Sequence, residues 1–295
     1  MSDKAVVLVT GSSTGFGRLT SVALARRGYR VIASMRDVTG RNRRHAADLE
    51  ALGQKENLRL GVVELDVTDD RSVNDAVDRI VRDAGRIDIV VNNAGISCWA
   101  LTETSTVEQT KQLFETNFFG VLRVNRAVLP HMRKRRSGLL IHISSVAGRL
   151  VMPSLGIYCA TKFALEAMAE TLRYELSQLG IDSVIVEPGP YPTDIFANTA
   201  DVTDPVRAAE YGALAEIPRK VRDGLAAADT NSQDVIDRVI QLIEMQAGSR
   251  PVRTLVGVEQ FQPINDVALQ WQTVVLQNSG FGELMILRRP EPEVG

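Results

Sequence analysis

The stretch Ala5-Val6-Val7-Leu8-Val9-Thr10-Gly11-Ser12-Ser13-Thr14-Gly15-Phe16-Gly17 decides the fold of this 295-residue chain. Its five apolar residues predict a buried strand, and apolar side chains recur at helical spacing after it. A glycine turn between strand and helix exposes backbone N–H groups at the helix N-terminus, where they stabilise a pyrophosphate. The spacing is G-x-x-x-G-x-G rather than the common G-x-G-x-x-G. The alternative is a glycine-rich turn without a ligand. We expect a dinucleotide to be held by Gly11, Ser13, Gly15, Phe16 and Gly17.

Short apolar runs alternate with helix-period segments over the first two thirds of the chain, as in repeated βαβ units. The runs are rich in Val, Ile and Leu without polar alternation, which predicts strands covered on both faces. Thr106 and Gln109 form a predicted capping box for a helix that runs toward Asn117. The fold class is therefore a single-domain doubly wound Rossmann α/β fold, a parallel sheet with helices on both faces. The predicted strands cover residues 5–9, 30–34, 58–65, 87–91, 139–143 and 183–186.

No linker interrupts the chain, so we expect one domain spanning residues 1–295. Prolines after Pro188 predict a substrate-covering segment at about 190–230. An amphipathic helix at 233–245 and a short strand near 254–258 follow. A C-terminal tail at about 259–295, with a helix around 265–276, docks on the core, on a second subunit or across the substrate cleft.

Composition excludes several classes of function. A net charge of -2 argues against a nucleic-acid partner, and no apolar run is long enough for a membrane span. Cys98 and Cys159 stand apart in sequence, which suits free thiols in a cytoplasmic protein. The three histidines lack metal-ligand spacing, so no metal site is expected.

The second predicted strand ends at Met35-Arg36-Asp37, where cofactor selectivity is decided in dinucleotide-binding folds. An acidic side chain there holds the 2′-hydroxyl of NAD, and an arginine accommodates the 2′-phosphate of NADP. Met35 occupies the position expected for an NAD-selective acid, and Arg36 follows at once. This favours NADP, with NAD the weaker alternative. A solvated loop without influence on selectivity is the structural alternative.

Tyr158 and Lys162 lie four positions apart in a segment of helical periodicity, so both side chains project from one face. A phenol is a poor acid or base at neutral pH, but an ammonium beside it favours the phenolate and lowers its pKa. Such a pair can transfer a proton. The same spacing also arises by chance on many helices with a solvated lysine.

With the glycine turn and Tyr158-x-x-x-Lys162 in one chain, the sequence resembles the classical short-chain dehydrogenase/reductase family. The resemblance implies that Asp66 and Val67 contact adenine. It places Asn93 and Gly95 beside the ribose, and the loop from Pro188 to Thr193 at the nicotinamide carboxamide. Its catalytic set here is Asn117, Ser145, Tyr158 and Lys162, with Ser145 preferred to Ser144 by its separation from Tyr158. More loosely, the sequence is similar to the hydroxysteroid and retinol dehydrogenase branch.

These matches imply an NADP(H)-dependent oxidoreductase that interconverts a carbonyl compound and its alcohol, with Tyr158 as proton donor or acceptor. Ser145 would hold the carbonyl oxygen, Lys162 would also bind the nicotinamide ribose, and Asn117 would sustain a water-linked proton path. His142 stands where the family often has Asn and is expected to be a hydrogen-bonded core residue. The family also implies a homo-oligomer. The alternative is a catalytically silent dinucleotide-sensing or scaffold protein of the same fold.

The identity of the substrate depends on the last hundred residues, which contain no motif that indicates a substrate. A lipophilic carbonyl compound is favoured, because small-molecule sites are mostly apolar. A set of apolar and aromatic residues either lines a substrate pocket or belongs to the ordinary core. These residues are Trp99, Met152, Tyr191, Ile195, Phe196, Tyr211, Leu214 and Ile217.

Overall fold

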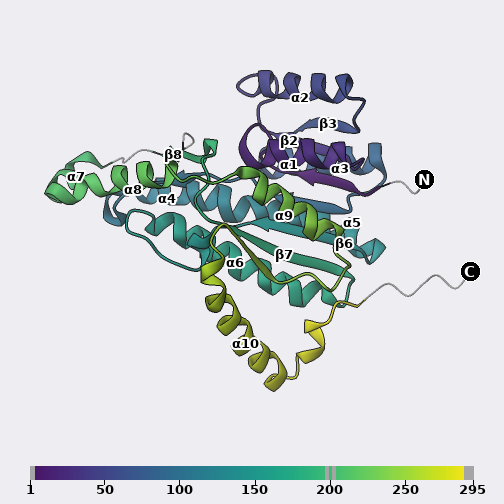
Figure 1. The fold of residues 1–295 in the computed structure, drawn as a ribbon. Coiled ribbons are helices and arrows are strands. Elements are labelled where there is room, and N and C mark those ends of the chain that lie inside the picture. Colours follow the sequence, from purple (N-terminus) through teal and green to yellow (C-terminus); the bar gives the residue numbers. More distant parts are fainter. Residues whose placement is uncertain (1–3, 197–198, 201–203, 289–295) are drawn as a thin grey trace, which may run out of the picture.

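A computed structural model describes residues 4–196, 199–200 and 204–288, and its centre is a seven-stranded sheet (Figure 1). All neighbouring strands run parallel, in the order β3-β2-β1-β4-β6-β7-β9. The Rossmann prediction is therefore confirmed, and each predicted strand is present with ends shifted by up to two residues. The strands are β1 (Val6–Val9), β2 (Arg30–Met35), β3 (Leu60–Glu64), β4 (Ile89–Asn92), β6 (Gly138–Ile143), β7 (Ile181–Pro188) and β9 (Arg253–Val256).

The strand order reverses next to β1, which fixes where a ligand can bind. Val7 of β1 lies opposite Val31 of β2 on one side and Ile89 of β4 on the other. The connections after β1 and after β4 therefore leave in opposite directions. A crevice forms at the carboxyl ends of the strands at such a switch point.

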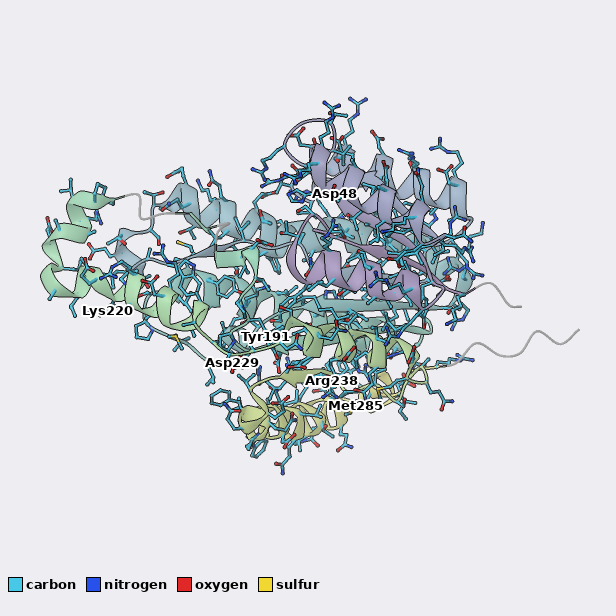
Figure 2. All side chains as sticks on the ribbon, turned by 45° about the horizontal axis from the view of Figure 1, so that its top comes forward. Asp48, Tyr191, Lys220, Asp229, Arg238 and Met285 are labelled. Atoms are coloured by element: carbon cyan, nitrogen blue, oxygen red, sulfur yellow. The ribbon has the colours of Figure 1, made fainter. Side chains whose placement is uncertain are left out.

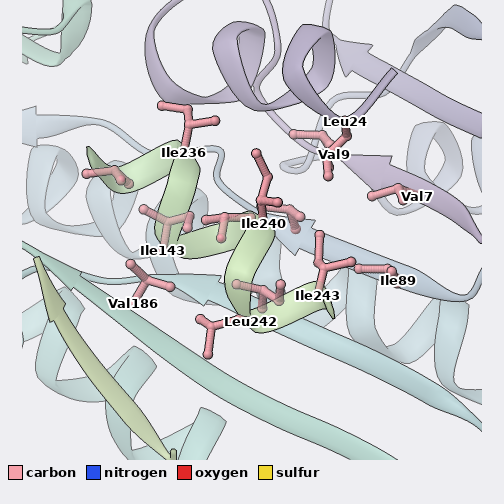
Figure 3. Packing of buried hydrophobic residues seen from close by; sticks show 14 of the residues in the cluster. Val7, Val9, Leu24, Ile89, Ile143, Val186, Ile236, Ile240, Leu242 and Ile243 are labelled. Carbon is pink, nitrogen blue, oxygen red and sulfur yellow. The ribbon is translucent and has the colours of Figure 1, made fainter. Parts of the chain in front are cut away.

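Helices cover both faces of the sheet, and alternate residues of β1 face the two layers. Val7 and Val9 pack with α1 (Gly15–Arg26) and α9 (Ser232–Glu244), the latter seen against the sheet in Figure 3. The neighbouring α2 (Arg43–Lys55) covers the same face beside β2. Val6 and Leu8 face the opposite layer. That layer holds α3 (Asp70–Ala84), α5 (Gly120–Arg135) and α6 (Gly156–Ser177).

The helix expected to run toward Asn117 is interrupted. Thr106 caps α4 (Val107–Phe114) in the predicted capping box. Its side chain accepts the backbone N–H of Gln109, and the Gln109 side chain accepts the backbone N–H of Thr106. The chain then passes through a single π-helical turn, Glu115–Phe119, before α5 begins. Such π-bulges are frequent at functional sites. The sequence pattern did not reveal the bulge, because the apolar spacing continues through it.

The covering segment after β7 contains structure that the sequence did not predict. A short strand β8 (Thr199–Ala200) pairs with β5 (Ser97–Cys98), and the helices α7 (Pro205–Glu210) and α8 (Ile217–Ala226) project from the body (Figure 1). Glu103 anchors this projection by accepting from the hydroxyl of Tyr211 at 2.6 Å and pairing with Arg207 at 3.3 Å.

The tail begins with α10 (Gln262–Asn278), which stands off the sheet in Figure 1. Near the two ends of this helix, Asn265 and Leu276 are buried, whereas Trp271 in its middle is 65% exposed. The chain then returns to α6, where Gln178 donates to the carbonyls of Glu283 and Ile286. Within this chain, the described part of the tail contacts the core through Asn265 and Gln178, and its first residues, Gln260 and Phe261, line the cleft described below. Across the described residues, no helix combines the length and the apolar character needed to span a bilayer.

Candidate functional site

One cleft of about 1230 Å³ opens along the carboxyl ends of the strands, from the end of β2 to the N-terminal turns of α6. Fourteen of the sixteen residues predicted for the site line it; Gly17 and Asn117 do not. The lining residues among them are Gly11, Ser13, Gly15, Phe16, Arg36, Asp66, Val67, Asn93, Gly95, Ser145, Tyr158, Lys162, Pro188 and Thr193.

The glycine turn forms a cradle that side chains would fill. Gly11 and Gly15 have positive φ angles of 67° and 54°. A Cβ on Gly17 would lie 2.3 Å from the carbonyl oxygen of Gly11, so this glycine permits close packing from beneath the cleft. The Thr14 side chain makes no capping hydrogen bond to α1, which leaves the first N–H groups of the helix for an anion. These features fit a bound pyrophosphate.

Asn93 holds the glycine turn against β4. Its Nδ2 donates to the carbonyls of Thr10 at 2.9 Å and Gly11 at 3.1 Å. The Thr10 hydroxyl in turn accepts from the backbone N–H groups of Asn93 and Ala94 at 3.0 and 3.1 Å. These hydrogen bonds fix the ends of β1 and β4 to each other. The Asn93 side-chain amide is used for this contact, although Asn93 also lines the cleft.

At the far end of the cleft, the loop after β2 turns its arginines and its aspartate in different directions. Asp37 adopts a positive φ of 50° and its carboxylate accepts the backbone N–H of Arg41 at 2.8 Å. Arg36 and Arg41 line the cleft, together with His45, whereas Asp37 does not. Nearby, Asp66 accepts from the backbone and hydroxyl of Thr68 at 2.9 and 2.8 Å. A cationic pair thus stands where an adenosine 2′-substituent would lie.

At the other end, α6 presents Tyr158 and Lys162 beside Ser145. The Lys162 Nζ lies 5.7 Å from the centroid of the Tyr158 ring and donates to the carbonyl of Ile143 at 2.9 Å. The Ser145 hydroxyl accepts the N–H of Ala147 at 3.1 Å and donates to the carbonyl of Pro188 at 3.4 Å, and it is near enough to Tyr158 to lower the pKa of the phenol. A hydroxyl pair and an ammonium therefore converge at one point of the cleft.

The charge states of this group differ from the sequence prediction. Burial raises the pKa of Tyr158, and the nearby Ser145 hydroxyl lowers it only in part. Burial also lowers the pKa of Lys162 to about 8, against an opposing effect of Glu166. In the protein alone the net pKa of Tyr158 is therefore raised rather than lowered, because desolvation of the phenolate is the largest effect. Tyr158 is accordingly a protonated phenol at neutral pH, the form that donates a proton.

Asn117 lies in the π-helical turn beneath the cleft, and its side chain is fully engaged. The Oδ1 atom accepts the N–H of Ile96 at 2.9 Å, while Nδ2 donates to the carbonyl of Ile96 at 2.9 Å and to Thr161 at 3.0 Å. Thr161 itself donates to the carbonyl of Tyr158 at 2.8 Å. Asn117 thus ties the segment after Gly95 to the helix that carries Tyr158.

His142 is a core residue, as predicted. It is fully buried, with its Nδ1 atom 3.4 Å from Nδ2 of Asn92 and its Nε2 atom 3.2 Å from the hydroxyl of Ser183. Burial lowers the pKa of His142 to about 3. Cys98 and Cys159 are free and buried in one apolar cluster beside Tyr158, and burial raises the pKa of both thiols. Among the residues that the structure describes, no group of three or more His, Cys, Asp or Glu could hold a metal ion.

The substrate end of the cleft is apolar and drawn from distant segments. Of the residues left open between pocket and core, Trp99, Met152, Tyr191 and Ile195 line it, and Figure 2 shows Tyr191 near the middle of the molecule. Tyr211, Leu214 and Ile217 do not, and the Phe196 side chain lies outside the described part. Sequence reasoning also missed apolar residues for which periodicity gave no signal. Among them are Leu225 on α8 and, outside the long helices and the strands, Leu150, Val151, Leu155, Val258 and Phe261.

Comparisons with known proteins agree with this geometry. The 3-ketodihydrosphingosine reductase of Bacteroides thetaiotaomicron is 37% identical over 193 residues, which are 65% of this chain and 66% of that protein. Retinol dehydrogenase 8 of Homo sapiens is 40% identical over 191 residues, 64% of this chain and 59% of that protein. The chain therefore matches about two thirds or less of the length of each of these relatives.

A solved short-chain dehydrogenase from Streptomyces avermitilis has the same fold, with a TM-score of 0.77 and 27% identity, over 96% of this chain and 99% of that chain. The model of the family described as short chain dehydrogenase matches residues 5–203, from β1 to beyond the Pro188–Thr193 loop. The matched range contains the glycine turn, Ser145, Tyr158 and Lys162, and the chain belongs to the short-chain dehydrogenase family.

Proposed function

We propose that the protein is an NADP(H)-dependent oxidoreductase that interconverts a carbonyl compound and its alcohol. The convergence of Ser145, Tyr158 and Lys162 in the cleft that begins at the glycine turn carries this proposal. A catalytically silent dinucleotide sensor is the competing function. Such a protein would have no use for a buried phenol that shares the cleft with a serine and a lysine, so the site favours catalysis.

The mechanism assigns one task to each side chain. The glycine turn and Arg36 would hold NADP(H), whose nicotinamide would supply the hydride for the carbonyl carbon. The Ser145 hydroxyl donates a hydrogen bond to the carbonyl oxygen as negative charge develops there. Tyr158, held protonated by burial, passes its proton to that oxygen. The Lys162 ammonium stabilises the tyrosinate that forms and binds the nicotinamide ribose, and Asn117 maintains the path by which the proton is replaced.

A preference for NADP over NAD is supported by the orientation of the loop after β2. Arg36 and Arg41 face the cleft, while the carboxylate of Asp37 is turned onto the backbone of its own loop. Two guanidinium groups attract a 2′-phosphate, and no carboxylate is presented to a 2′-hydroxyl there. His45 lines the same end and adds a further hydrogen-bond donor.

The substrate that we propose is a lipophilic carbonyl compound or its alcohol. The inner cleft is lined by Trp99, Met152, Leu155, Leu225 and Phe261, with Ser145 and Tyr158 among its polar groups. An apolar pocket with few convergent polar groups selects an apolar ligand with one reactive oxygen. The relatives named for 3-ketodihydrosphingosine and retinol act on molecules of that character, which supports the same choice here.

We further propose that residues 1–295 form one domain that associates with itself in the cytoplasm. Two exposed aromatic residues support association, Phe119 in the π-helical turn that holds Asn117 and Phe163 on α6. Light scattering after size-exclusion chromatography tests it, and a monomer at all concentrations would contradict it. The free, buried thiols of Cys98 and Cys159 suit a reducing compartment.

The activity is tested by following nicotinamide absorbance with long-chain and polycyclic ketones, aldehydes and secondary alcohols. Tyr158→Phe should reduce turnover by at least about 100-fold, because general acid–base catalysis contributes that much or more. Binding of the dinucleotide should remain, as measured by calorimetry. Tyr29→Phe, at a tyrosine between α1 and β2 that does not line the cleft, is the matched control. Clear cofactor binding without turnover of any compound would favour the sensor instead.

A further inference from the structure

Helix α6 carries a third ionisable residue in line with the catalytic pair. Tyr158, Lys162 and Glu166 are spaced four residues apart, so they follow one another along one face of the helix. Glu166 is 2% exposed and does not line the cleft. A carboxylate so deeply buried is costly unless its charge is matched by neighbours.

The Glu166 side chain is wedged beneath the turn that follows Ser145. A Cβ on Gly148 would lie 2.8 Å from Cγ of Glu166 and 2.9 Å from the Ser144 hydroxyl, so only glycine fits between them. The Ser144 hydroxyl lies on the other side of this glycine from the Glu166 side chain. Glu166 therefore packs against the turn that follows the catalytic serine, close to the residue that precedes it.

Charged groups from every element packed on Glu166 form one cluster. From β9, Arg253 Nε donates to Glu166 at 2.8 Å and lies 3.6 Å from Glu187 of β7, while its Nη2 pairs with Glu170 of α6 at 2.6 Å. The other oxygen of Glu187 accepts from Asn265 of α10 at 2.5 Å. Asn265 also accepts from Arg149, at 3.0 Å, in the loop after Gly148.

Within this cluster, Glu166 is the carboxylate one helical turn from Lys162 on the same face of α6. Burial raises the pKa of Glu166, and the positive charge of Arg253 opposes that effect. In its ionised form Glu166 favours the ammonium form of Lys162. Glu170 has a similar bond to Arg253 but lies a further turn along α6 from Lys162. The two glutamates thus share a structural partner and differ in their separation from the active-site lysine.

We propose that Glu166 is a positioning residue of the proposed reaction, whose carboxylate keeps the buried Lys162 protonated and braces the strand end that carries Ser145 against α6. This inference rests on the proposed function for its catalytic consequence. Its electrostatic part concerns the protein alone, and it can be measured without substrate or cofactor.

The direct experiment is an NMR titration of the protein labelled with ¹³C at the lysine side chains, with Lys162→Met used to assign the Lys162 signal. E166Q removes the charge and keeps the shape of the side chain. We expect it to lower the titration midpoint of Lys162 by about one pH unit. E170Q is the matched control, because it removes a carboxylate from the same arginine, and the midpoint should stay at the wild-type value.

Two results would overturn the inference: an unchanged midpoint in E166Q, or equal shifts in E166Q and E170Q. If E166Q does not fold, E166D replaces it. Its shorter side chain withdraws the charge from Lys162, so a smaller fall of the midpoint is expected, and no fall would contradict the proposal.

The pH profile of turnover then tests the catalytic consequence. The alkaline limb of kcat/KM, where activity is lost as Lys162 deprotonates, should move to lower pH in E166Q by the same amount as the NMR midpoint. In E170Q it should stay in place even if thermal stability falls. A shifted NMR midpoint in a protein without turnover of any compound would leave the electrostatic inference standing and refute the proposed function.

Discussion

The ammonium nitrogen of Lys162 lies 2.9 Å from the carbonyl oxygen of Ile143, the last residue of β6. Ser144 and Ser145 follow immediately, so a single strand end supplies both the acceptor for the lysine and the serine that lies beside Tyr158. The relative positions of all three functional groups are consequently set by the packing of one helix on one strand. This relation makes the lysine sensitive to substitution in a particular way.

Lys162→Met should separate stability from activity. The Lys162 side chain is buried, and this desolvation lowers the pKa of its ammonium to about 8, so an apolar side chain of similar length costs little or raises the melting temperature. Turnover should fall by about 100-fold or more, because the tyrosinate loses its neighbouring positive charge. Lys134→Met, at an exposed position near the end of α5, is the control. A large loss of stability with retained turnover would show that the lysine is structural.

Arg36→Asp should exchange the preferred cofactor. A carboxylate beside the 2′-phosphate repels NADP(H), so we expect its Kd to rise by at least about 10-fold, while that of NAD(H) changes little. Calorimetric titration of both dinucleotides measures this. Arg43→Asp changes the charge equally at an exposed residue that does not line the cleft, so it should leave the ratio of affinities near the wild-type value. Equal weakening of both cofactors by Arg36→Asp would contradict the assignment.

Local chemistry explains which parts of the site could be predicted from the sequence. The strand and the glycine turn at Gly11–Gly17 are contiguous, and Tyr158 and Lys162 are neighbours on one helix, so their geometry follows from backbone regularity. The Thr106 capping box was predicted for the same reason. Each of these features needs only a few adjacent residues.

What the sequence did not reveal depends on contacts between distant segments. The π-helical turn around Asn117 is fixed by hydrogen bonds to Ile96 and Thr161, and Leu225 and Phe261 reach the cleft only through the path of long loops. The rise in the pKa of Tyr158 likewise comes from burial by tertiary structure, which a Tyr-x-x-x-Lys pattern does not contain. Spacing indicates which groups meet, but the surrounding packing decides their charge states.

Gly17→Ala should damage the cofactor site through sterics. A methyl group at this position would lie 2.3 Å from the carbonyl oxygen of Gly11 and 2.4 Å from Nδ2 of Asn93, so the turn must open. We expect a loss of roughly 1–3 kcal/mol in the free energy of unfolding, as for other overpacked sites, and weaker dinucleotide binding. Urea unfolding and calorimetry measure the two effects.

The same substitution in an open helix serves as the control for Gly17→Ala. A Cβ on Gly224 of α8 meets nothing within 4 Å, so Gly224→Ala should stabilise the protein by about 0.5–1 kcal/mol through helix propensity. If both variants behaved alike, the close approach at Gly17 would not be the reason for its glycine.

His142 should make the protein sensitive to mild acid. Burial lowers its pKa to about 3 in the folded protein, from an ordinary value of about 6.5 in the unfolded chain. Between these values the unfolded chain binds a proton that the folded protein does not, so the free energy of unfolding falls as the pH drops from 6.5 toward 3.

His142→Asn keeps a side chain able to bond Asn92 and Ser183 and removes this proton linkage. Relative to pH 7, the wild type should lose about 2 kcal/mol more than the variant at pH 4.5, in urea unfolding. His131→Asn removes a histidine at a partly exposed position on α5 and is the matched control, which should follow the wild-type pH dependence. Parallel pH profiles for wild type and His142→Asn would mean that the buried imidazole accepts a proton in place, at the expense of its bond to one neighbour.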